Sequence, residues 1–138
     1  MVRHPDLHQI MAFERGDSPG SWQLPQGGLE AGEEPLDGAW RELAEETGLG
    51  PDEVVVRAEF PDWIPCEWPA EVKAESGRDG KRRGQVHKWF LFDALSSDIV
   101  PRPDGREFVA WKWVTPQWLV DSVLEWRRDA YQRVLGSL

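Results

Sequence analysis

The chain has 138 residues, a formal net charge of −9 and one cysteine, Cys66. This length suits one domain that buries roughly two-thirds of its unfolded surface, and the acidic balance argues against non-specific nucleic-acid binding through an overall basic surface. A lone cysteine excludes an internal disulfide, and the sequence shows neither a bilayer-spanning apolar run nor a signal peptide, so we expect a single cytoplasmic domain over residues 1–138.

The first predicted elements are a strand, a turn and a glycine-rich loop. An apolar run at residues 10–13 favours a buried strand within Leu7–Arg15, and residues 16–20 have the composition of a turn. Three glycines between residues 27 and 32 allow the backbone to approach a ligand closely. This loop is therefore a candidate for ligand contact.

A helix is predicted directly after the loop. Pro35 suits its first turn, and Gly48 followed by Pro51 ends it. A stripe of residues with helical spacing predicts the face that packs on a core, and it contains Leu36, Ala39, Trp40, Leu43 and Thr47.

Three glutamates lie on a second stripe of the same helix. Glu42, Glu45 and Glu46 are related as i, i+3 and i+4, so their carboxylates gather on one side and repel one another. A divalent cation removes this conflict, because hard cations such as Mg²⁺ bind carboxylate oxygens together with substrate phosphates. For this pattern taken alone, a solvated acidic face is the alternative.

Further strands are predicted at Glu53–Phe60, Gln85–Leu95 and Arg106–Val114, with Gln85–Leu95 central in the sheet. Three prolines restrict any strand within Asp62–Ala70 to a short or edge position. Residues 71–84 predict a polar hairpin loop, and phosphate contact by the four basic residues within 77–84 is the alternative to a simple surface role.

The C-terminal part predicts helical structure. Thr115 suits an N-cap and Pro116 the first helical position, with a break expected before Glu125. Strands interleaved with two helical segments indicate an α/β fold, in which a mixed sheet lies between helices.

The glycine-rich loop and its helix fill the Nudix box without a gap or substitution. The box requires Gly, five residues, Glu, seven residues and Arg-Glu-aliphatic-any-Glu-Glu-any-Gly-aliphatic, and it is met by Gly27, Glu33, Arg41, Glu42, Leu43, Glu45, Glu46, Gly48 and Leu49. The chain therefore resembles a Nudix hydrolase. Residues 22–28, Trp-Gln-Leu-Pro-Gln-Gly-Gly, resemble the box entrance of RNA 5′-pyrophosphohydrolases and diadenosine polyphosphate hydrolases. The resemblance implies a Nudix-type α/β/α sandwich.

The resemblance also implies a metal-dependent reaction. Nudix hydrolases cleave nucleoside diphosphates linked to another group, using Mg²⁺ or Mn²⁺ bound by the box helix. By resemblance, Glu42 and Glu46 are the main metal ligands and Glu45 is a further or water-bridged ligand. A backbone carbonyl near Gln26 and Gly27 is implied as another ligand.

Further catalytic residues are implied on both sides of the helix. Arg41 pairs with Glu33, which fixes the loop against the helix. Glu107, outside the box, is implied as a general base or an extra metal ligand, and a surface carboxylate at a strand start is the alternative.

Three residues are implied in substrate binding. Lys88 would neutralise phosphate, Trp126 would stack on a base and Arg127 would lie near the phosphates, whereas ordinary strand and core roles are the alternatives for Lys88 and Trp126. The chain departs from the subfamily at Cys66, where a tyrosine is typical, and at His87, where glutamine is frequent. These departures leave open which groups contact the distal nucleotide.

The N-terminal strand is apparently truncated relative to other Nudix domains. Only residues 1–3 precede the turn-like residues 4–6. Three explanations stay open: the sheet lacks most of a strand, the true start lies upstream, or a partner chain completes the sheet in a dimer.

We expect an enzyme that removes pyrophosphate from 5′-triphosphorylated RNA ends or splits dinucleoside polyphosphates, with a nucleotide or RNA 5′ end as its partner and no membrane. One alternative is a housekeeping Nudix hydrolase that acts on other nucleoside diphosphate derivatives. The other is a catalytically silent nucleotide-binding Nudix module, against which the intact box glutamates argue.

Overall fold

The computed structural model describes residues 1–26, 29–67 and 84–138. Its strands are β1 (Val2–Arg3), β2 (Ile10–Arg15), β3 (Trp22–Gln23), β4 (Val54–Glu59), β5 (Ile64–Glu67), β6 (Gly84–His87), β7 (Phe90–Ala94) and β8 (Phe108–Val114), and its helices are α1 (Pro35–Thr47), α3 (Pro116–Ser122) and α4 (Glu125–Leu135). The main sheet has the order β3-β2-β1-β7-β4, and β8 also pairs with β2. Because β1 and β7 are parallel and the other pairs antiparallel, the sheet is mixed, as predicted.

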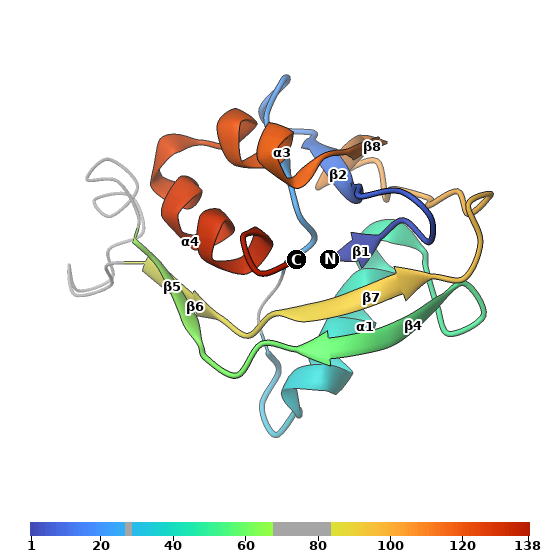
Figure 1. Cartoon of the computed structure of the whole chain (residues 1–138). Coiled ribbons are helices and arrows are strands. Elements are labelled where there is room, and N and C mark those ends of the chain that lie inside the picture. Colours follow the sequence, from blue (N-terminus) through green and yellow to red (C-terminus); the bar gives the residue numbers. More distant parts are fainter. Residues whose placement is uncertain (27–28, 68–83) are drawn as a thin grey trace.

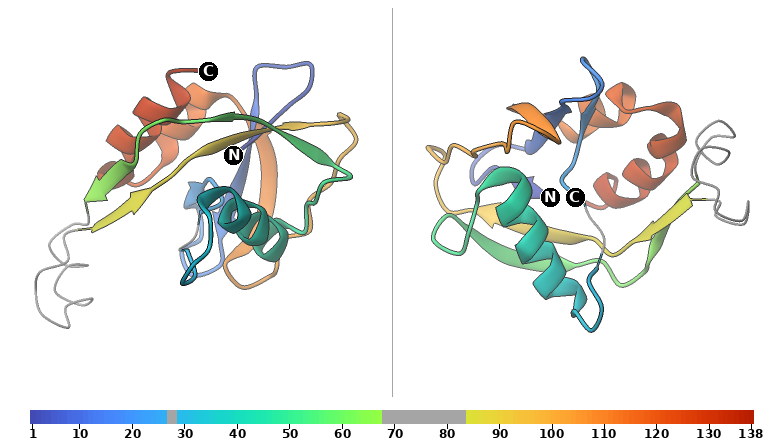
Figure 2. Two further views of the ribbon diagram at one scale, coloured as in Figure 1. Left: turned by 90° about the horizontal axis from the view of Figure 1, so that it is seen from below. Right: turned by 180° about the vertical axis from the view of Figure 1, so that it is seen from behind.

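Helices cover both faces of this sheet (Figure 1). Figure 2 shows α1 on one face and α3 with α4 on the other. Each face has its own hydrophobic core, with Leu43 and Phe92 on the α1 side and Ile10 and Leu119 on the α4 side. This arrangement confirms the expected α/β/α sandwich.

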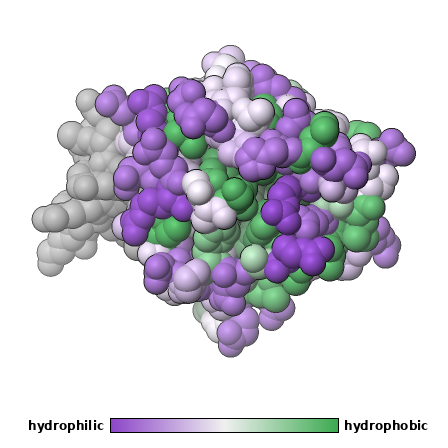
Figure 3. Space-filling view, viewed as in Figure 1, coloured by the Kyte–Doolittle hydropathy of each residue, from purple (hydrophilic) through white to green (hydrophobic). Residues whose placement is uncertain are grey.

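Hydrophilic residues cover much of the face shown in Figure 3, and hydrophobic residues reach the surface near its centre and at its right and lower parts. Within the described part of the chain, no helix is long and apolar enough to cross a membrane.

The N-terminal strand is short, as expected, but it lies inside the sheet. Val2 and Arg3 pair in parallel with Phe92 and Asp93, and Arg3 also pairs with Ile10 of β2. Val2 is fully buried, and the Arg3 guanidinium donates to the Asp93 carboxylate at 2.8 and 3.1 Å. Two residues therefore join β2 to β7.

The prediction of one continuous strand over Gln85–Leu95 is wrong. The chain forms β6 and β7, separated at Lys88 and Trp89. β6 pairs with β5 in a separate two-stranded ribbon, whereas β7 pairs with β1 and β4 in the main sheet. The break therefore lets the chain leave one sheet and enter another, while the indole of Trp89 packs in the α4-side core.

Both ends of α1 follow the sequence prediction. Pro35 occupies the first turn, and Gly48 ends the helix in the left-handed region with φ 73°. A Cβ atom at Gly48 would lie 3.0–3.1 Å from Arg102 side-chain atoms, so close approach also favours glycine. Arg102 donates from its backbone N–H to Thr47 O at 2.6 Å and from its guanidinium to Gly48 O. This side chain therefore places positive charge at the negative end of α1.

The expected pairing of Arg41 with Glu33 is confirmed. Arg41 donates from Nε to Glu33 Oε2 at 2.8 Å and from Nη2 to Glu33 Oε1 at 2.9 Å. The backbone N–H of Glu30 donates to the same carboxylate at 3.0 Å. These bonds, led by those from Arg41, lower the pKa of Glu33 to about 2. The loop before α1 is therefore tied to the helix by a bidentate ion pair.

The C-terminal helices also follow the prediction. Thr115 Oγ1 accepts from the backbone N–H of Trp118 at 3.1 Å, and α3 ends at Ser122, whose C-cap Val123 directly precedes the N-cap of α4 at Leu124. The buried Tyr131 hydroxyl of α4 accepts a bond from the backbone N–H of Leu24 at 2.9 Å. Helix α4 is thereby joined to the segment that enters the glycine-rich loop.

Replacing Glu33 by Gln should weaken the acid dependence of stability. The folded-state pKa of Glu33, about 2, lies below its ordinary value of 4.5, so the pair stabilises fully above pH 4.5 and this contribution is lost as the pH falls toward 2. The urea concentration at the midpoint of unfolding should fall between about pH 6 and about pH 3, and this fall should be smaller for Glu33→Gln than for wild type. Glu34→Gln is the control, because the Glu34 side chain makes no capping hydrogen bond. Equal losses in all three proteins would contradict the assignment.

Replacing Tyr131 by Phe should destabilise the fold by about 1–3 kcal/mol, because the buried N–H of Leu24 loses its acceptor. Chemical denaturation measures the free energy of unfolding. Thr115→Ser, which keeps a hydroxyl cap on α3, should change it little. An unchanged midpoint for Tyr131→Phe would show that water replaces the hydroxyl.

Candidate active site

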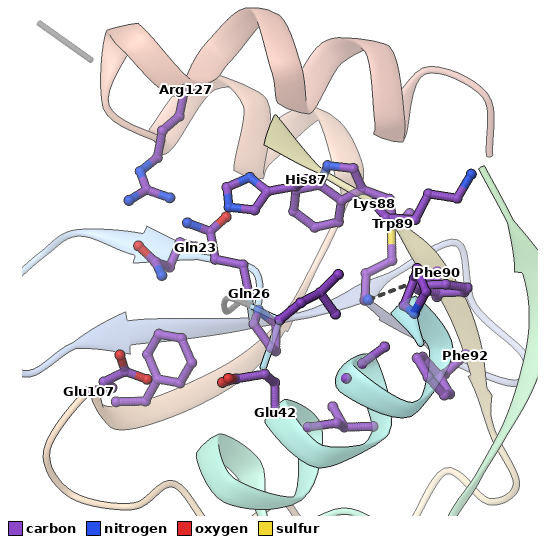
Figure 4. Close-up of a pocket in the computed structure, with 18 of the residues that line it drawn as sticks. Gln23, Gln26, Glu42, His87, Lys88, Trp89, Phe90, Phe92, Glu107 and Arg127 are labelled. Carbon is purple, nitrogen blue, oxygen red and sulfur yellow. Dashed lines mark hydrogen bonds between the residues drawn. The ribbon is translucent and has the colours of Figure 1, made fainter. Parts of the chain in front are cut away.

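A cavity of about 790 Å³ lies between the box helix and the C-terminal helix. Figure 4 shows Glu42 and Glu107 at one end, Arg127 and His87 at the opposite end, and Gln23 between them. Glu42 comes from α1, Gln23 from β3 and Arg127 from α4, and Glu107 directly precedes β8. The cavity therefore separates a carboxylate end from a cationic end.

Glu46 is the buried member of the glutamate stripe. It is 3% exposed, and within the described part of the chain its Oε2 atom has no hydrogen-bond partner. Burial, followed by the adjacent carboxylates of Glu107 and Glu42, strongly raises the pKa of Glu46. This carboxyl group can hold its charge near neutral pH only if a cation compensates it.

The other two stripe glutamates are held by Arg41. Its Nη1 donates to Glu42 Oε1 at 2.7 Å and to Glu45 Oε2 at 3.3 Å. The Glu42 side chain is 19% exposed and that of Glu45 is 58% exposed. The three glutamates thus lie in three environments, from buried to solvated, and do not form one solvated acidic face.

The residues at the carboxylate end fit a hard divalent cation. The donors are oxygens, which such ions prefer, and the Oε2 atom of Glu46 has no hydrogen-bond partner among the described residues. In residues 1–26, 29–67 and 84–138, no three His, Cys, Asp or Glu side chains already form a metal-binding cluster. Gln26 lines the cavity, whereas Gly27, expected beside it as a source of a carbonyl ligand, lies outside the described residues.

Lys88 and Glu107 are placed differently from each other. Glu107 is exposed, lines the cavity and neighbours Glu46. The Lys88 ammonium donates to Pro61 O at 2.8 Å and lies 3.4 Å from Glu59 Oε1. Figure 4 shows it directed away from Glu42 and Glu107.

Arg127 is buried at the cationic end. It is 6% exposed, its guanidinium lies 4.5 Å from the ring centroid of Trp126, and its Nε has no hydrogen-bond partner among the described residues. Trp126 is half-buried against the α4-side core and is not among the residues that line the cavity. Its indole therefore supports Arg127. The basic residues of the expected polar loop, at positions 78–83, lie outside the described part of the chain.

Several polar residues in the cavity were not predicted from sequence. Gln23 and Arg15 line it, and Arg15 donates to Asp17 at 2.7 and 2.8 Å. Strand alternation could have found Gln23, because neighbours on β3 face opposite sides and Trp22 packs on the α4-side core. Burial, and next the charge of Arg127, lowers the pKa of His87, so its imidazole is neutral near neutral pH.

Comparison with known proteins identifies the family. Residues 2–134 match the NUDIX domain. An RNA pyrophosphohydrolase of Roseobacter denitrificans is 41% identical over 125 residues, which cover 89% of this chain and 78% of the relative. Nudix hydrolase 25 of Arabidopsis thaliana is 36% identical over 136 residues, covering 93% of this chain and 77% of that protein.

The solved structures agree on the fold. The dihydroneopterin triphosphate pyrophosphohydrolase of E. coli superimposes with a TM-score of 0.79, over 99% of this chain and 92% of the other, at 18% identity. The family match and the similarity to these relatives show that the chain belongs to the Nudix family and is a hydrolase of phosphoanhydride bonds.

Proposed function

We propose that this chain is a metal-dependent pyrophosphohydrolase of nucleoside polyphosphates, acting on 5′-triphosphorylated RNA ends or dinucleoside polyphosphates. The observation that carries the proposal is the buried Glu46, which has an unsatisfied Oε2 atom and neighbours Glu42 and Glu107. Glu42 and Glu107 line the cavity that Arg127 also lines. A polyphosphate with its cations suits such a site, because the cations compensate the carboxylates while the arginine binds the far end of the anion.

The residues divide the work by position. Glu42 and Glu46 would hold a divalent cation, with Glu45 reaching it through water and Glu107 as a further ligand. Bound Mg²⁺ or Mn²⁺ supplies Lewis acidity toward phosphate oxygens and lowers the pKa of a bound water. Arg41 keeps Glu42 oriented, and Glu33 in turn holds Arg41.

Glu107 and Arg127 would have two further functions, proton transfer and phosphate binding. Glu107 neighbours Glu46 and lines the cavity, so it would take the proton from the attacking water if it does not bind metal. Arg127, at the cationic end of the cavity, would pair with substrate phosphate. Its guanidinium packs over the ring of Trp126, which restricts its motion. The reaction is hydrolysis of a phosphoanhydride bond by in-line attack.

The choice of substrate rests on the relatives and on the box entrance. The relatives named RNA pyrophosphohydrolase match most of this chain, which favours a 5′-triphosphorylated RNA end. Residues 22–28 resemble both those enzymes and diadenosine polyphosphate hydrolases, so a dinucleoside polyphosphate is the second candidate.

A substrate panel should separate these candidates. With Mg²⁺ or Mn²⁺ present, we expect pyrophosphate or phosphate release from a triphosphorylated oligonucleotide or from diadenosine polyphosphates, and much slower release from nucleotide sugars. Excess chelator should abolish turnover, and added metal should restore it. Fast turnover of nucleotide sugars alone would favour a housekeeping hydrolase, whereas no turnover of any substrate would favour a silent module.

Replacing Glu46 by Gln should reduce hydrolysis by several orders of magnitude while the fold persists, because the change removes the buried charge and keeps the shape. A second readout is independent of activity. Mg²⁺ that binds only the folded protein raises the melting temperature, and this rise should be lost in Glu46→Gln. Glu34→Gln should keep both the rate and the thermal shift. A full Mg²⁺ shift in Glu46→Gln would place the cation elsewhere.

A further inference from the structure

Trp63 lines the cavity and is unusually exposed to solvent for an aromatic side chain. It is 48% exposed, lines the cavity and belongs to the segment between β4 and β5. Trp89 also lines the cavity but is only 4% exposed, and Trp118 is 37% exposed but does not line it. Among the described tryptophans, Trp63 alone combines a cavity position with an exposed ring.

The segment that carries Trp63 is anchored where it begins. The backbone N–H of Phe60 donates to Trp89 O at 3.0 Å. Next to it, the Lys88 ammonium donates to Pro61 O at 2.8 Å and lies 3.4 Å from Glu59 Oε1. The Lys88 side chain is 11% exposed, whereas its partner Glu59 is 58% exposed, so the ammonium is partly covered while its contacts lie at the surface. Lys88 therefore anchors the backbone segment that leads to Trp63.

Within the described residues, the Trp63 indole differs from other tryptophans in having no aromatic or cationic partner. Trp22 and Trp118 hold the Lys112 ammonium at 4.3 and 4.0 Å from their ring centroids, and Arg127 lies over Trp126. No ring or cation from the described residues lies against Trp63. An exposed indole beside a polyphosphate site has the properties of a stacking platform, because every nucleobase presents a π-face.

We propose that Trp63 is the platform on which the nucleobase next to the cleaved polyphosphate stacks, with Lys88 as a positioning residue that holds the Trp63 segment. The inference rests on the proposed function, since it requires a base-bearing polyphosphate in the cavity. It moves base recognition from Trp126, which does not line the cavity, to Trp63, which does. Trp126 then acts through Arg127, and Trp63 contacts the substrate.

The test compares a ligand with a base and one without. Calorimetry with ATP and with inorganic tripolyphosphate, in Ca²⁺ under conditions without turnover, gives the affinity of each for wild type and variants. Trp63→Ala should weaken ATP binding about 5- to 150-fold and leave tripolyphosphate binding unchanged, because one stacked base is lost. Trp63→Phe should recover most of the ATP affinity. Trp118→Ala, which removes an exposed tryptophan outside the cavity, should change neither.

The outcomes separate the platform from the proposed function. Unchanged ATP affinity in Trp63→Ala, or an equal loss for ATP and tripolyphosphate, would overturn the platform while leaving the hydrolase intact. If wild type binds tripolyphosphate no more weakly than ATP and hydrolyses none of the base-bearing substrates, the proposed function fails together with the platform. Lys88→Met should reproduce a smaller part of the ATP-selective loss if Lys88 positions the segment, and an ATP-independent loss would assign it to phosphate.

Discussion

A carboxylate that folding removes from water governs this structure. Glu46 is surrounded by protein and by two further carboxylates, so its charge is unfavourable unless a cation compensates it. A stable core position would be apolar, and a stable surface position would be solvated. The fold accepts an unsatisfied oxygen here because α1 is anchored at both ends, by the Glu33–Arg41 pair and by Arg102 at Gly48. Proteins commonly keep an energetically unfavourable group at a functional site by holding it within rigid surrounding structure.

The charge distribution follows from the same constraint. A chain with a net charge of −9 repels a polyphosphate at long range, and salt screens this repulsion over about 8–10 Å. Among the described residues, attraction can come from within the cavity, where Arg127 is buried and Arg15 is partly buried. Arg15 is held by Asp17 and Arg127 by an aromatic face, so Arg127 carries the less compensated charge. Binding energy is thus concentrated at few groups, which favours specificity over general affinity for anions.

Local signals predicted local structure well. Pro35, Gly48 and Thr115 act through their own backbone geometry, so the helix ends could be read from the sequence. Helical spacing also grouped the glutamates, but spacing cannot say which of them is buried, because the burial of Glu46 depends on distant segments such as that of Glu107. The break at Lys88 and Trp89 contains no glycine or proline that would predict it. It arises because β6 pairs with β5 and β7 pairs with β4 in a different sheet. The cavity position of Trp63 likewise depends on contacts that the sequence does not display.

The two-residue strand β1 also affects the order in which the molecule assembles. Its ion pair joins Arg3 to Asp93 across 90 residues of chain, and the Leu24–Tyr131 bond spans 107. Such contacts close long loops, so they form slowly compared with the local turns of α1. During synthesis the box helix can form long before β7 and α4 emerge, while Glu46 still faces water and carries its ordinary charge. The Glu46 carboxyl group therefore loses its contact with water only when the last third of the chain, which includes Glu107, docks, so an incomplete chain contains the box sequence without its buried glutamate.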